Sequence, residues 1–181
     1  MPDNDDKKNP PQVDTRRRLS RRNLLRRLGG QREDRPGAAA MGFDNLGREA
    51  DRLIREQQYE QALAVYERMT ERDPRHREAW RYKGWCLINL DRPAEARNAL
   101  QILLKSHSDD GHALLYTGMT HAMEGDVELA LDVWRQYRDY AKVLIMREIN
   151  LMLDEADQDK PLEGTDLTRR IEDAIRRQAQ G

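Results

Sequence analysis

The hydrophobic positions of this chain repeat with a period of 34 residues between residues 43 and 144. Aligning residues 43–76, 77–110 and 111–144 brings small residues into two rows and large apolar residues into three. The small rows are Ala50, Gly84, Gly118 and Ala62, Ala96, Ala130; the large rows are Leu46, Trp80, Leu114, then Tyr66, Leu100, Trp134, then Met69, Leu103, Tyr137. These rows in register predict three structural repeats.

Each repeat is predicted to contain two helices that pack against each other. The first helix presents a large residue and, four positions later, a small one that allows close approach of the second helix. Turn-forming pairs separate the two helices at Gln57–Gln58, Leu90–Asp91 and Glu124–Gly125. Because neither helix can bury its apolar stripe alone, the pairs must stack, and the pattern predicts an all-α array.

Two further helices are predicted after the repeats. Residues 140–157 have one apolar and one polar face, which is typical of a helix that caps an array; an exposed dimerisation helix is the alternative. Thr165 is a favourable N-cap for a last helix over residues 165–179. Its narrow apolar stripe leaves its docking position open.

The second repeat resembles the tetratricopeptide repeat (TPR) consensus. Its matching residues are Trp80, Lys83, Gly84 and Leu87 in the first helix, and Ala96, Leu100 and Leu103 in the second. The resemblance implies a right-handed α-solenoid of three helix-turn-helix repeats with C-terminal capping helices. It also implies a non-catalytic adaptor, scaffold or assembly factor that binds a peptide or helix of a protein partner.

In this family the first helix of each repeat lines the concave face. The matching positions here include Asp44, Arg48, Asp51, Arg55, Arg81, Tyr82, Trp85, Asn89, His112, Leu115, Tyr116, Met119 and Met123. Aromatic anchors dominate the energy of such surfaces, so we expect Tyr82, Trp85 and Tyr116 to contribute most, with a core position as the alternative for Trp85. The Lys/Asn clamp of some members is absent, because its positions hold Gly47, Asp51, Tyr82, His112 and Tyr116.

The formal net charge of −1 hides a basic N-terminal arm. Residues 15–35 hold nine arginines against two acidic residues, and residues 15–28 predict a basic amphipathic segment between a disordered stretch, 1–14, and a flexible linker, 29–42. The arginines of that segment are Arg16, Arg17, Arg18, Arg21, Arg22, Arg26 and Arg27. An acidic protein or an anionic membrane surface is the expected partner of the arm, and a solvated tail is the alternative. Nucleic acid is disfavoured because the arm has no aromatic residue.

Part of the arm, Ser20-Arg21-Arg22-Asn23-Leu24-Leu25-Arg26, resembles a twin-arginine export signal. Such a signal needs an apolar region after the arginines, and charged residues and a proline stand there instead. We therefore expect a cytoplasmic protein, peripheral to the inner membrane of a bacterium if the arm binds lipid. The alternatives are an exported periplasmic TPR protein and a chaperone for secreted proteins.

Catalytic chemistry finds no support in the sequence. No phosphate-binding loop, Ser/His/Asp set or metal-ligand spacing occurs, so we expect neither enzyme activity nor a cofactor or metal. His107 and His112 are expected on the surface, and the single cysteine, Cys86, is expected as a small buried residue.

Overall fold

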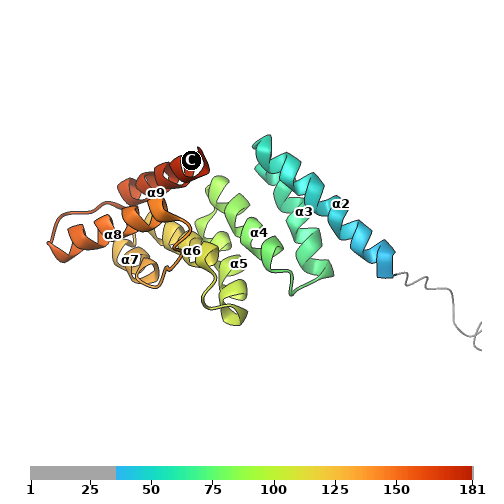
Figure 1. Ribbon diagram of the computed structural model, residues 1–181, viewed down its shortest axis with the longest axis horizontal. Helices are drawn as coiled ribbons and strands as arrows, with labels where there is room; N and C mark the ends of the chain where they lie inside the picture. Colours follow the sequence, from blue (N-terminus) through green and yellow to red (C-terminus); the bar gives the residue numbers. More distant parts are fainter. Residues whose placement is uncertain (1–35, 181) are drawn as a thin grey trace, which may run out of the picture. The chain divides into compact units, whose positions relative to one another are not determined.

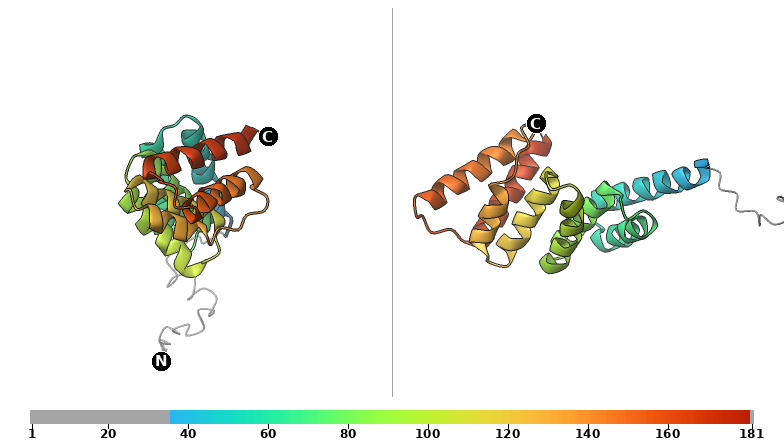
Figure 2. Two further views of the ribbon diagram at one scale, coloured as in Figure 1. Left: turned by 90° about the vertical axis from the view of Figure 1, so that its left-hand side faces the viewer. Right: turned by 90° about the horizontal axis from the view of Figure 1, so that it is seen from below.

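The computed structural model describes residues 36–180, which contain helices and no strands (Figure 1). The segments predicted over residues 1–14, 15–28 and 29–35 lie outside the described residues. The helices are α2 (Pro36–Arg55), α3 (Tyr59–Arg72), α4 (Arg77–Asn89), α5 (Pro93–Ser106), α6 (Gly111–Met123), α7 (Val127–Trp134), α8 (Val143–Asp157) and α9 (Gly164–Gln180). In the compact unit that begins at Ala40, α3 to α7 follow one another in chain order (Figures 1 and 2).

The turns inside the helix pairs repeat with the 34-residue period of the sequence. Gln57, Asp91 and Gly125 have φ values of 56°, 56° and 85°. The residue that follows each of them donates its backbone N–H to the carbonyl of the residue five positions before it, over 2.9 Å. This hydrogen bond satisfies a carbonyl at the end of the first helix. Asp159, with φ 54°, lies 34 residues after Gly125 and makes the same turn between α8 and α9. The sequence predicted a loop between two helices here, but not that its turn continues the 34-residue period.

Small residues set the distance between the two helices of a pair. A Cβ at Gly84 would lie 2.6 Å from Leu100 Cδ2, and a Cβ at Gly118 would overlap Trp134 Nε1. Trp134 is fully buried and its indole N–H donates to the Leu115 carbonyl over 3.0 Å. Only glycine permits this approach, so the rows of small residues predicted from the sequence mark real helix crossings.

The C-terminal pair departs from the array because α9, and not α8, packs along α6. At positions 34 residues after the fully buried Ala113 and Thr120, α8 has the charged residues Arg147 and Asp154. If α8 packed beside α6, these charges would be buried there at a large desolvation cost. The helix α9 takes that place instead, with Gly164 so close to α6 that a Cβ would overlap the Ala122 carbonyl oxygen.

The predicted linker over residues 29–42 is partly helical, because α2 begins at Pro36. Proline is favourable in the first turn of a helix, where its missing N–H has no intrahelical partner. Residues 38–40 are alanines, the strongest helix formers. Their helix propensity outweighs the neighbouring glycines that had suggested a flexible linker over residues 36–42.

Gly118→Ala should destabilise the protein, whereas Gly47→Ala should not. The new methyl group at position 118 collides with Trp134, and overpacking of this kind costs roughly 1–3 kcal/mol. Gly47 lies within α2, and a Cβ added there would have no heavy atom within 4 Å, so alanine should stabilise by about 0.5–1 kcal/mol. Urea denaturation followed by circular dichroism measures both, and equal stability of Gly118→Ala and the wild type would contradict the packing described.

Candidate partner-binding surface

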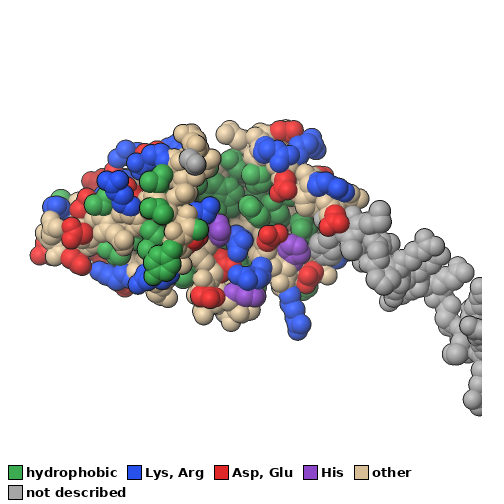
Figure 3. All heavy atoms as spheres, viewed as in Figure 1, with side chains coloured by type: hydrophobic (Ala, Val, Ile, Leu, Met, Phe, Trp, Pro, Cys, Tyr) green, Lys and Arg blue, Asp and Glu red, His purple; other side chains and the backbone are tan. Residues whose placement is uncertain are grey.

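Aromatic side chains of α3, α4 and α6 stack across neighbouring helices. The rings of Tyr66 and Tyr82 stack with centroids 5.5 Å apart, and Trp85 of α4 lies 5.0 Å from Tyr116 of α6 at an angle of 30°. His112 meets the edge of Tyr116 at 6.1 Å. Figure 3 shows hydrophobic side chains gathered in a hollow over the middle helices, with charged side chains on its flanks.

Trp85 lies at the boundary between surface and core. Its side chain is half-buried and packs against the core cluster, and its neighbour Asn89 is exposed, with its amide N–H donating to the Trp85 carbonyl over 2.8 Å. Tyr82 is also half-buried. Trp85 therefore has features of both predicted positions, groove and core. Its ring packs against Tyr116, and part of the side chain stays accessible. A half-buried aromatic of this kind is a suitable anchor for a partner.

The third repeat contributes less surface than the sequence predicted. Tyr116 is 8% exposed, Leu115 2% and Met119 0%, so their predicted place in the groove is wrong. The cause is α9, whose residues Leu167 and Ile171 are fully buried and which packs along α6. Only a small cavity of about 130 Å³ remains there, lined in part by His112, Tyr137, Lys142, Ile145, Ile175 and Gln178.

The first repeat provides an acidic hollow of about 410 Å³ between α2 and the start of α4. Its lining residues are Asp44, Gly47, Arg48, Asp51, Met69, His76 and Glu78. Three of these are carboxylates and one is an arginine, Arg48, which donates to the Asn45 side-chain oxygen over 2.6 Å. The predicted residues Asp44, Arg48 and Asp51 thus come together, and Arg55 is exposed further along α2.

Arg81 was predicted in the groove, and its guanidinium is committed to an ion pair. Asp110 is buried at the N-terminus of α6, where its carboxylate accepts from the Ala113 amide over 3.0 Å, from Arg81 over 2.7 Å and from Arg77 over 2.9 Å. Burial by itself raises the pKa of Asp110, but the hydrogen bonds from Arg81, Arg77 and Ala113 outweigh it and lower the pKa to about 2. Sequence reasoning missed Asp110, although its position before an apolar helix is an N-cap signal.

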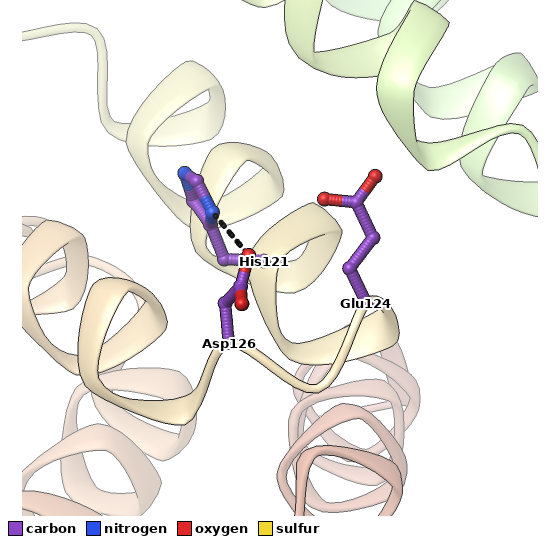
Figure 4. Close-up of side chains that lie close together, drawn as sticks. All are labelled: His121, Glu124 and Asp126. Atoms are coloured by element: carbon purple, nitrogen blue, oxygen red, sulfur yellow. Dashed lines mark ion pairs between the residues drawn. The ribbon is translucent and has the colours of Figure 1, made fainter.

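His121, Glu124 and Asp126 surround the turn between α6 and α7 and have the residue types of a metal site (Figure 4). His121 Nδ1 lies 3.8 Å from Asp126 Oδ2. The Arg97 guanidinium is ion-paired with Glu124 and lies 3.4 Å from His121 Nδ1. Arg97 already pairs with Glu124 and holds a positive charge beside His121 Nδ1, so a metal ion bound here would compete for one ligand and be repelled by the guanidinium.

Cys86 is fully buried, as predicted, and burial raises the pKa of its thiol to about 12. The reactive thiolate is therefore scarce at neutral pH. Among the described residues, no helix is long and apolar enough to cross a membrane.

Stacked helix pairs with an aromatic inner surface define an all-α repeat protein of the kind that binds other proteins. Residues 53–116 match the tetratricopeptide repeat family model. A solved structure titled "MamA RS-1 ArsTM double mutant" is similar with a TM-score of 0.55 and 16% sequence identity, over 76% of this chain and 78% of that one. A search of curated proteins found no match. The predicted fold class, a TPR-type α-solenoid, is confirmed. The match to the family model supports a protein–protein interaction or scaffold role.

Asp110→Asn should lower the free energy of unfolding by about 2 kcal/mol at neutral pH, because asparagine keeps the cap and loses the ion pairs. The pKa of Asp110 is lower in the folded state than its ordinary value of 3.8, so the stabilisation is complete above about pH 4 and is lost as the pH falls towards about 2. Urea denaturation from pH 7 to 2 should show the two proteins converging.

Asp109→Asn is the matched control, since Asp109 is exposed directly before Asp110 and forms no ion pair with a described residue. It should change stability little at any of these pH values. A constant difference between wild type and Asp110→Asn across the whole pH range would rule out the ion pairs as its source.

Proposed function

We propose that the protein is a non-catalytic adaptor that binds an amphipathic segment of a protein partner along α2 and α4. The half-buried aromatic pair Trp85 and Tyr82 carries this proposal, because it offers apolar contact area that is already held in place by stacking on Tyr116 and Tyr66. Rigid aromatic side chains lose little entropy on binding and are frequent hot spots.

The charge of the surface selects the kind of segment. The hollow beside α2 has the carboxylates Asp44, Asp51 and Glu78, and its one arginine is hydrogen-bonded to Asn45. Arg81 and Arg77 share the single carboxylate of Asp110, which offsets one of their two positive charges, whereas the hollow has three carboxylates against one arginine. A helix or peptide with an apolar face and lysines or arginines beside it therefore complements the surface in both shape and charge.

The basic arm gives the adaptor a second contact. Its arginines, Arg16 to Arg18, Arg21, Arg22, Arg26 and Arg27, lie outside the described residues, and their excess of positive charge supports recruitment to an acidic protein or an anionic membrane surface. In this proposal the protein works in the cytoplasm, at the membrane when the arm is engaged. Fractionation of cells that make the full-length protein or a variant without residues 1–35 tests this recruitment.

Trp85→Ala should weaken the binding of a partner peptide about thirtyfold, which corresponds to the loss of an anchor worth roughly 2 kcal/mol. The probe is a peptide selected against the full-length protein from a displayed random library, and calorimetry measures its affinity. Asp51→Lys should also weaken the binding of a basic peptide, because it reverses one charge of the hollow.

Ile102→Ala is the control, since Ile102 is 44% exposed on α5 and lies away from the proposed surface. It should leave the affinity unchanged. Selected peptides that bind Trp85→Ala as tightly as the wild type would exclude this surface, and acidic or purely polar peptides would exclude the proposed charge selection.

A further inference from the structure

Exposed large hydrophobic side chains concentrate on the outer face of α8 and the turn before it. Tyr140 is 79% exposed, Val143 62% and Leu151 43%. They line a shallow groove of about 560 Å³ together with Met146, Arg147, Asn150 and Asp154. The other large exposed hydrophobics of the described residues, Ile102 and Leu129, lie singly on α5 and α7. A continuous exposed apolar face marks an interaction site more often than a scattered residue does.

The charged residues on the two sides of α8 differ in whether they form ion pairs. On the side facing α9, Arg170 pairs with Glu148 over 2.7 Å and with Glu155 over 2.6 Å. On the outer face, Arg147 is exposed and forms no ion pair within the part of the chain that the structure describes. Asp154 accepts a hydrogen bond from the side-chain amide of Gln158 over 2.8 Å. The outer face therefore offers one unpaired positive and one unpaired negative group.

The spacing of these two groups makes the face complementary to itself. Arg147 and Asp154 are seven residues apart, about two turns, so they lie on the same face of the helix with Asn150 and Leu151 between them. When two such helices run antiparallel about a twofold axis through the Asn150–Leu151 peptide, each Arg147 lies opposite Asp154 of the partner subunit. The two leucines meet at the axis.

We propose that α8 forms a homodimer interface, in which two copies of this chain pack their α8 helices antiparallel. A symmetric interface must pair one surface with itself, and opposite charges placed evenly about an apolar centre satisfy that requirement. An anionic membrane is a poorer occupant, because this face carries Asp154 as well as Arg147. The interface does not use the inner surface of α2 and α4, so it is independent of the proposed partner site.

The test measures the mass of the full-length protein by sedimentation equilibrium over micromolar concentrations. The wild type should be a dimer in reversible equilibrium with monomer. Leu151→Asp should raise the dimer dissociation constant at least about a hundredfold, because it places two carboxylates at the apolar axis. Arg147→Asp should raise it about tenfold or more, because like charges then face each other twice.

The double variant Arg147→Asp/Asp154→Arg restores the pairing with the signs exchanged and should dimerise as the wild type does. Leu129→Asp, on an exposed leucine of α7, is the control and should leave the dimer intact. A monomeric wild type at these concentrations overturns the proposal, as does a Leu151→Asp protein that still dimerises. A double variant no tighter than Arg147→Asp overturns the antiparallel arrangement. Circular dichroism of every variant confirms that a lost dimer is not a lost fold.

Discussion

The close approach of paired helices at small residues is the constraint on which the rest of the structure depends. At Gly118 the helix backbone of α6 touches the indole of Trp134, and that indole in turn donates a hydrogen bond to the Leu115 carbonyl of the same helix. Gly84 and Leu100 make the corresponding contact one repeat earlier. Because the turn between the helices recurs every 34 residues, these contacts set the relative position of α4 and α6. The stacking of Trp85 on Tyr116 follows from that position.

The C-terminal pair changes the usable surface of the array. The charges of Arg147 and Asp154 keep α8 out of the seat beside α6, and α9 occupies it with its apolar stripe. The face of α6 that the repeat pattern assigns to the groove therefore becomes part of the core, and Met119 is fully buried. The accessible inner surface then comes from α2 and α4, with an acidic part beside α2 and an aromatic part on α4. One sequence feature, two charged residues at positions that are small in the second and third repeats, thus both shortens the inner surface and leaves an apolar outer face on α8.

Much of the fold was predictable because a solenoid is built from local contacts that recur. The rows through Gly84 and Ala96 placed the helices and their crossings, and the turn at Asp91 followed from the same period. The position of α9 was not predictable. An amphipathic stripe shows that one face of a helix is buried, but it does not identify the helix against which that face packs. The ion pair of Asp110 with Arg81 joins residues 29 positions apart, and helical periodicity carries no signal for such a pair. Of the candidate site, Trp85 and Tyr82 were placed by the repeat alignment, whereas the burial of Tyr116 depended on α9.

The central claim is that partners bind at the inner surface of α4. A photoactivatable phenylalanine analogue in place of the exposed Asn89, beside Trp85, tests it most directly, with the same analogue in place of Ile102 as the comparison. After irradiation of cells that make each protein, we expect a covalent adduct with a partner protein from position 89, lost in the Trp85→Ala background and absent from position 102. Adducts that are equal at the two positions, or that persist in full with Trp85→Ala, would contradict the claim.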